Sequence, residues 1–175
     1  MKTCTKKLVL LSALFGGLGL IPAGRVSAQT FTTLYSFTAA LDRSYYNNSD
    51  GAYPSAGLIV SGNTLYGTAA DGGSSGAGTV FAVNTDGTGF TSLHSFAPNP
   101  NGGTNSDGAN PAAGLILSGN ILYGTAEYGG SSRNGTVFAV NTDGTGFTTL
   151  HSFTASPSLF LNLIITATEL FRRVS

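Results

Sequence analysis

The chain has one cysteine and no tryptophan, and only 9% of its 175 residues carry a charge. The cysteine, Cys4, lies near the N-terminus. The remainder of the chain has no thiol, which excludes disulfides, thiolate metal sites and cysteine nucleophiles there. What the composition does supply is glycine, with 25 residues, together with abundant small polar side chains. This composition is typical of a β-protein with many turns.

Basic charge is scarce and unevenly placed. Lys2, Lys6, Lys7 and Arg25 precede residue 29, and beyond it four arginines face eight acids, a net charge of −4 with no lysine. Binding to nucleic acid relies on clustered lysine and arginine that neutralise phosphates, and attachment to an anionic membrane needs the same residues. We therefore expect no nucleic acid partner. The inventory also offers no nucleophile–base pair for catalysis.

The first 28 residues have the outline of a signal peptide. Three lysines precede an apolar run over residues 8–21, and the small residues Val26, Ser27 and Ala28 follow. This order predicts export with cleavage after Ala28. The alternative is a membrane anchor, but the apolar run is shorter than the ~20 residues that a spanning helix needs. We expect an extracellular or cell-surface bacterial protein with no membrane span in its mature form.

One long string of residues occurs twice. Residues 57–96 return almost unchanged at residues 114–153, always 57 positions later. A fixed period of this size indicates a repeat architecture. Each copy divides into four short strands between turns rich in Asn, Asp and Gly, residues suited to tight turns. In the first copy the strands are expected at residues 57–60, 64–69, 79–83 and 90–96.

Four antiparallel strands per repeat are typical of a β-propeller blade, and we predict an all-β partial β-propeller of two blades. Residues 31–37 match the last strand of each repeat, so they form an orphan N-terminal strand, which in a closed ring completes the final blade. A β-solenoid is the alternative. Gly67 and Gly124 lie within strands and predict a bulge or a closely approaching backbone. The apolar blade faces are expected from Leu58, Ile59, Val60, Leu65, Val80, Phe81, Val83 and their counterparts.

The strings LYGTA and GTVFAVN recur in both copies, within the longer pattern GLI-x-SG-x-x-LYGTA…GTVFAVNTDGTGF. This pattern resembles the GloVer tandem repeat from residue 31 to about residue 155. The resemblance implies an exported bacterial protein built of propeller-like repeats, with no assigned activity. It supplies no catalytic residues to carry over.

The tail departs from the repeat. Instead of a loop like residues 45–54, the chain reads SPSLFLNLIITATELFRRVS. A shifted reading frame through this stretch can encode Tyr-Asn-Asn-Ser-Asp-Gly-Ala, which predicts a frameshift product; a C-terminal sorting segment is the alternative. The expected divisions are a signal peptide (1–28), the orphan strand with the loop that follows it (29–56), repeat 1 (57–113), repeat 2 (114–156) and the aberrant tail (157–175).

Four residues are candidates for binding. Tyr66 and Tyr123 are candidate exposed aromatic contacts, although packing between blades is the alternative role. Asp50 and Asp107 belong to Ser-Asp-Gly turns that lead into the repeats, and one carboxylate per blade would gather around a closed ring. No catalytic residue and no cofactor is expected.

Two features suggest metal binding and are better explained otherwise. His94 and His151 occupy equivalent positions, but Tyr35 stands at the corresponding place before the first repeat, which favours flat packing over ligation. The string NTDGTG resembles a calcium loop, yet the position that needs a bidentate glutamate holds Ser95. We therefore predict a hairpin turn and no metal site.

The function expected from these features is a non-catalytic structural or binding module, with a glycan or another surface protein as partner. The alternative is a secreted lyase or hydrolase that acts on polysaccharide at a propeller face. Two blades leave apolar faces uncovered, because repeats of this kind bury their faces against one another. Self-association through those faces is therefore a further expectation.

Overall fold

The computed structural model describes residues 30–39 and 47–154. The compact unit that contains both repeats begins at Thr33, and residues up to Thr32 belong to a separate unit. The expected signal peptide (1–28) and aberrant tail (157–175) lie outside the described residues. Within the described part the helical content is a single 3-10 segment, Pro100–Gly102, and no helix there is long and apolar enough to cross a membrane.

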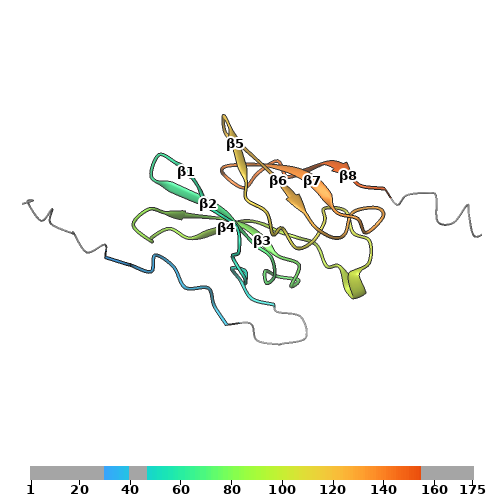
Figure 1. The fold of residues 1–175 in the computed structure, drawn as a ribbon, viewed down its shortest axis with the longest axis horizontal. Helices are drawn as coiled ribbons and strands as arrows, with labels where there is room; N and C mark the ends of the chain where they lie inside the picture. The colour runs from blue at the N-terminus through green and yellow to red at the C-terminus, as the bar shows by residue number, and fades with distance from the viewer. Residues whose placement is uncertain (1–29, 40–46, 155–175) are drawn as a thin grey trace, which may run out of the picture. The chain divides into compact units, whose positions relative to one another are not determined.

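The first repeat forms a four-stranded antiparallel sheet, sheet 1, with its strands in chain order (Figure 1). The strands are β1 (Ile59–Ser61), β2 (Thr64–Ala69), β3 (Thr79–Asn84) and β4 (Thr91–Ser95). At the tip between β3 and β4, Asp86 accepts hydrogen bonds from the backbone N–H and the hydroxyl of Thr88 at 2.9 and 2.7 Å. A short polar side chain that bonds two residues ahead is a turn device, so the predicted hairpin turn is confirmed.

The second repeat forms sheet 2 with the same order and register (Figure 1). Its strands are β5 (Ile116–Ser118), β6 (Ile121–Ala126), β7 (Thr136–Asn141) and β8 (Thr148–Ser152). The pairing of Gly67 with Phe81 returns as Gly124 with Phe138. The predicted all-β class, with four antiparallel strands per repeat, is confirmed. Two sheets, without a closed ring, are what the described residues contain.

The strand glycines make room for side chains, which corrects the expectation of a bulge or a nearby backbone at these positions. A Cβ added to Gly67 would lie 2.5 Å from Leu58 and 2.7 Å from Phe81. The equivalent atom on Gly124 would lie 2.5 Å from Phe138. The bulge falls instead in the pairing of β3 with β4, between Val80 and Phe81. Glycine in β2 thus lets a phenylalanine ring from β3 cross the sheet surface.

The main core lies between the two sheets. Alternate side chains of a strand point to opposite faces, and Val80 and Ala82 of β3 point toward sheet 2. There they share one cluster with Leu122, Phe138 and other buried residues of the second repeat. The same core holds Tyr66, Ala77, Phe96, Ala109, Leu115, Ala126 and Val140.

The opposite face of sheet 1 is covered by residues 33–39, which we call the leading segment. Phe81 is buried on this face beneath Phe37, with the two ring centroids 5.3 Å apart. Tyr35 stacks on Phe90 at 3.9 Å with the rings 8° from parallel. No strand is assigned among the described residues 30–39, so the predicted orphan strand docks on sheet 1 without pairing into either sheet.

The residues predicted to form the apolar blade faces differ in how far they are covered. Val80, Phe81 and Val83 are buried, whereas Leu58 is 52% exposed and Val60 is also exposed. The counterpart of Leu58 in the second repeat, Leu115, is only 8% exposed, because it belongs to the core between the sheets. Burial at this position therefore depends on a preceding sheet.

Candidate functional site

The two aspartates expected to bind are buried at the points where one repeat meets the segment before it. Each lies in the sequence Asn-Ser-Asp-Gly, in the loop that leads to a sheet. The backbone carbonyl of Asp50 accepts a hydrogen bond from the Thr79 hydroxyl at 3.0 Å, and that of Asp107 accepts one from Thr136 at 2.9 Å. Each aspartate is thus fastened to its own sheet by the main chain, which leaves the carboxylate to bind the preceding segment.

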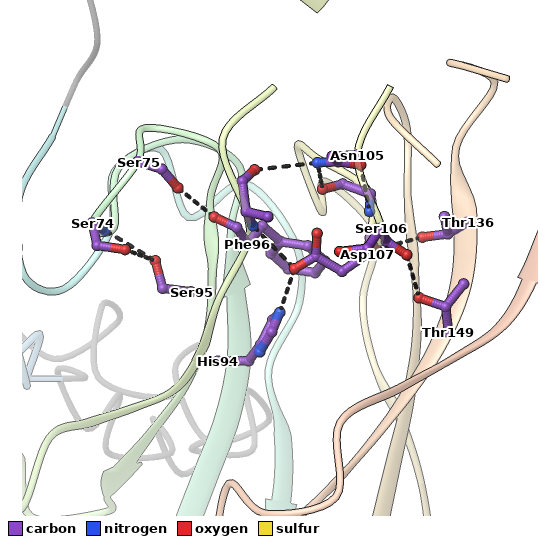
Figure 2. A network of polar contacts seen from close by, with 12 residues as sticks. Ser74, Ser75, His94, Ser95, Phe96, Asn105, Ser106, Asp107, Thr136 and Thr149 are labelled. Atoms are coloured by element: carbon purple, nitrogen blue, oxygen red, sulfur yellow. Dashed lines mark hydrogen bonds and ion pairs between the residues drawn. The ribbon is translucent and has the colours of Figure 1, made fainter. Parts of the chain in front are cut away.

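Asp107 binds the end of sheet 1. One oxygen, Oδ2, lies 3.0 Å from His94 Nε2 and accepts a hydrogen bond from the Ala97 backbone N–H, also at 3.0 Å (Figure 2). The His94 ring stacks on Phe147 of sheet 2 at 3.6 Å, with the planes 8° apart. His94 is therefore held by Asp107 in the loop before sheet 2 and by Phe147 of the second repeat, and its predicted role in packing is confirmed.

Asp50 binds the leading segment in the same way. Its Oδ2 accepts hydrogen bonds from the Tyr35 hydroxyl at 2.7 Å and from the Thr38 backbone N–H at 2.9 Å. Its Oδ1 accepts a third, from the Thr38 hydroxyl at 2.5 Å. The prediction that Tyr35 fills the place of the histidine is confirmed, because Tyr35 stacks on Phe90 as His94 stacks on Phe147.

These hydrogen bonds determine how the pair titrates. Burial raises the pKa of Tyr35 to about 12, with further contributions from its hydrogen bond to Asp50 and from the negative charge there. Burial alone would also raise the pKa of Asp50, but the hydrogen bonds from Thr38 and Tyr35 outweigh it and lower that pKa below its ordinary 3.8. The contact is therefore built for an ionised aspartate and a neutral tyrosine.

An asparagine two residues before each aspartate completes the site, and sequence reasoning missed it. Asn105 Oδ1 accepts the backbone N–H groups of Gly108 and Gly130, both at 2.9 Å. Its Nδ2 donates to the Ala97 carbonyl at 3.1 Å (Figure 2). Asn48 makes the equivalent bonds around Asp50, including one to the Thr38 carbonyl at 3.1 Å. The 57-residue recurrence of Asn48 was the signal that could have identified it.

The two sites differ at one oxygen. Asp107 Oδ1 is buried and has no hydrogen-bond partner within the described residues. The position that supplies a hydroxyl to Asp50 is Thr38, and its equivalent beside Asp107 is Ala97, which has none. A buried acceptor without a partner costs about 1–3 kcal/mol. The contact between the sheets therefore contains a local defect that the leading segment avoids.

The structure separates the two candidate tyrosines. Tyr66 is 8% exposed and belongs to the core between the sheets, so its expected exposure is wrong. Tyr123 lies at the same position in sheet 2 and is half-buried, since no described sheet follows to cover it. Packing between repeats is the role that Tyr66 has. A binding role for Tyr123 stays a prediction.

The arrangement is suited to holding repeats together. Each carboxylate points at hydrogen-bond donors of the segment before it, and no cluster of three or more His, Cys, Asp or Glu is found among the described residues. His151 of β8 lies at the equivalent of His94 but is exposed, in edge contact with Phe153 at 4.9 Å. His151 has the strand position of His94, but no sheet follows it within the described residues.

The repeat is also recognised by comparison with known proteins. The Gloeobacter/Verrucomicrobia repeat matches residues 16–160, most of the chain. The chain belongs to this repeat family. The resemblance inferred from the LYGTA and GTVFAVN strings is thereby confirmed. None of the curated proteins compared with the chain is similar enough to count as a match. In this member of the Gloeobacter/Verrucomicrobia repeat family, the shared strings form β2 and β3 with their counterparts β6 and β7.

Proposed function

We propose that the chain is a non-catalytic β-propeller module that acts, after export, as a structural or binding element outside the cell or on its surface. The observation that carries the proposal is the contact that occurs twice. Asp50 with Tyr35, and Asp107 with His94, join a repeat to the segment before it with the same stacked ring and the same carboxylate. A contact that recurs between successive repeats is the basis of an array.

Propeller closure is the finer part of this proposal. Each sheet has four antiparallel strands in chain order, as in a propeller blade. The leading segment makes the side-chain contacts of a last strand while it lacks the other three strands of a sheet. In a closed ring such a segment would complete the final blade. The intact ring would then need ~4–8 blades.

A structural role is supported by where the polar groups are used. Asp50, Asp107, Asn48 and Asn105 all bond to the main chain or side chains of neighbouring segments. The strand tips at Asp86 and Asp143 are exposed, and each aspartate there binds the threonine of its own turn. We infer that such polar loops contact the partner, a glycan or another surface protein. Tyr123 on the uncovered face is the remaining aromatic candidate.

Export is tested by expression of the full chain in a bacterial host. Protein recovered outside the cytoplasm should begin at Gln29, as read by N-terminal sequencing. Replacement of the small residue before the cut, Ala28→Glu, should abolish this cleavage, because the signal requires small side chains there. Protein that stays in the cytoplasm with its N-terminus intact would contradict export.

Binding and catalysis are separated by two measurements on the same preparation. A glycan array should show retention of one or more polysaccharides, while an assay for released reducing ends and for unsaturated products shows no turnover. Turnover that is lost on mutation of a single loop residue would instead support the secreted lyase or hydrolase. Absence of both glycan retention and turnover would leave a surface protein as the partner to be sought by crosslinking on whole cells.

A further inference from the structure

Sheet 2 exposes an apolar face whose equivalent on sheet 1 is buried in the core between the sheets. Phe96, which follows β4, is fully buried against sheet 2, whereas its counterpart Phe153, which follows β8, is 44% exposed. Ile116 and Leu150 are exposed as well, although their counterparts in sheet 1 pack against the core between the sheets. We call Ile116, Tyr123, Leu150, His151 and Phe153 the open face. It is one half of a contact whose complete form already exists in the same chain.

The other half of that contact is also present, on sheet 1. The residues of sheet 2 that receive β4 include Leu115, Leu122, Phe138 and Phe147. Their counterparts are Leu58, Leu65, Phe81 and Phe90, which we call the receiving face. The leading segment covers the two phenylalanines. It leaves Leu58 52% exposed, against 8% for Leu115 under a whole sheet. The receiving face is therefore filled only in part.

The polar groups of the two halves also match. The end of β8 offers His151, followed by Thr154, at the positions held by Tyr35 and Thr38 in the leading segment. Asp50 accepts hydrogen bonds from Tyr35 and from both the N–H and the hydroxyl of Thr38. A carboxylate that already binds this pattern of donors would receive the same three from a docked β8, with the imidazole of His151 in place of the phenol.

We propose that the open face of one copy docks onto the receiving face of a second copy and displaces the leading segment there. His151 and Thr154 of the docked copy then donate hydrogen bonds to the Asp50 carboxylate. The proposal deepens the propeller part of the proposed function and rests on its repeat-to-repeat contact, but it needs neither export nor a glycan. The contact joins two different faces, so it is head-to-tail and forms rings or open filaments. With the two described sheets in each copy, two to four copies supply the ~4–8 blades of a propeller.

A second copy suits the open face better than the end of this chain does. The repeat period places an aspartate 57 positions after Asp107, but residue 164 is isoleucine. Residues 155–175 contain no aspartate and a single acid, Glu169. They therefore lack the aspartate that both known contacts use at this position of the repeat. A second copy supplies this carboxylate as Asp50, and its receiving face supplies Phe90, on which the ring at this position stacks.

The first test compares two charged variants in and just after β8 by sedimentation velocity of the full chain over a range of concentrations. Phe153→Glu places a charge in the open face and should abolish the association of the native chain. Thr148→Glu places the same charge at the start of β8, but its counterpart Thr91 remains exposed beside the contact of sheet 1 with sheet 2. This control should associate as the native chain does. Association that survives Phe153→Glu, or that both variants lose, would overturn the proposal.

The second test asks whether the contact is head-to-tail. Leu58→Glu blocks the receiving face at an exposed position and leaves the open face intact, whereas Phe153→Glu does the reverse. Each variant alone should be monomeric, and an equimolar mixture should form a one-to-one complex. Circular dichroism checks that both variants retain the β-fold. Folded variants that fail to combine on mixing would refute the head-to-tail arrangement.

The third test uses the leading segment as the competitor. A double variant, Tyr35→Ala with Thr38→Ala, removes the groups that hold the segment on Asp50. The dissociation constant of the association should fall roughly tenfold. This is the gain expected if the leading segment leaves the receiving face uncovered in about one native copy in ten and in most copies of the variant. A double variant that is folded and monomeric at every concentration would overturn the proposal. The open face would then be covered by residues 155–175 or would stay uncovered.

Discussion

The leading segment and sheet 1 are bound by the repeats that follow them through the same carboxylate position, but they depend on it to different degrees. Asp50 holds the leading segment with both oxygens engaged. Asp107 holds sheet 1 with one oxygen engaged and the other without a hydrogen-bond partner among the described residues. Around Asp107 the two sheets share a large apolar core, whereas around Asp50 only a few rings of the segment contact sheet 1.

The difference indicates how the two contacts divide their stabilisation. Apolar burial grows with the area removed from water, so a whole sheet tolerates an unsatisfied acceptor. A short segment has little area to bury and also loses conformational freedom when it docks. It therefore depends more on a complete set of hydrogen bonds. The four predictions below test this division, from the largest expected effect to the smallest.

The largest effect should come from removing a ring in the core between the sheets. Phe96→Ala should lower the free energy of unfolding by about 3–5 kcal/mol, the usual cost of deleting a buried phenylalanine. The control is Phe153→Ala, which follows the equivalent strand but is largely uncovered, and it should change stability far less. Urea unfolding measured at a concentration where the chain is monomeric distinguishes the two. Equal losses would contradict the idea that burial at this position comes from the following sheet.

A second, smaller effect should appear when the leading segment loses its anchor. Asp50→Ala removes three hydrogen bonds to a carboxylate, and bonds to charged groups contribute about 1.5–3 kcal/mol each at most. The segment should undock, which amide hydrogen exchange would report as faster exchange at Thr38. The sheets themselves should remain folded. As a control, Asp86→Ala removes an aspartate that binds only its own turn, so exchange at Thr38 should stay slow.

The pH dependence of docking should have two limits. The pKa of Tyr35 is raised to about 12, so its stabilisation is complete below the ordinary tyrosine value of 10 and is lost as the pH rises toward 12. The pKa of Asp50 is lowered, so its stabilisation is present above 3.8 and is lost as the pH falls through the lowered value. NMR signals of the Phe90 ring would follow both limits. Tyr35→Phe should remove the tyrosine ionisation and leave the acid limit in place.

The smallest effect should come from repairing the defect at Asp107. Ala97→Thr supplies a hydroxyl at the position where Thr38 serves Asp50, and should raise the stability of the contact between the sheets by about 0.5–1.5 kcal/mol. Thr38→Ala is the reverse change in the other contact and should weaken docking of the leading segment by a similar amount. Thermal unfolding measures the first and amide exchange the second. If Ala97→Thr has no effect, Asp107 Oδ1 is already satisfied by solvent.

The sequence predicted the sheets well because their signals are local or periodic. The 57-residue repeat, the turn residues and the β-rich strings are sufficient to locate the eight strands of the described residues and their antiparallel order. Exposure was harder to predict, because it depends on which neighbour covers a face. Tyr66 and Tyr123 occur in the same string, yet one is buried between the sheets and the other is not. Nothing within the repeat itself carries that information.

The carboxylate site was only partly predictable for the same reason. Asp50 and Asp107 could be identified from their recurrence, but their partners come from the preceding segment at a different offset. Tyr35 and His94 are 59 positions apart while the aspartates are 57 apart, because the intervening loops differ in length. Spacing alone does not pair residues across such loops. The donors became clear only when the segments were placed side by side.

One loop residue makes the second sheet open to a simple enzymatic probe. Arg133 adopts a φ of 66°, in the left-handed region where Gly76 lies in the first repeat. It is exposed, and it is the one lysine or arginine among the described residues, so sheet 1 contains no site for trypsin. Cleavage there would separate the β5–β6 hairpin from β7 and β8. The rate of cleavage at Arg133 therefore reports the local opening of sheet 2, while opening of sheet 1 produces no cut within that sheet.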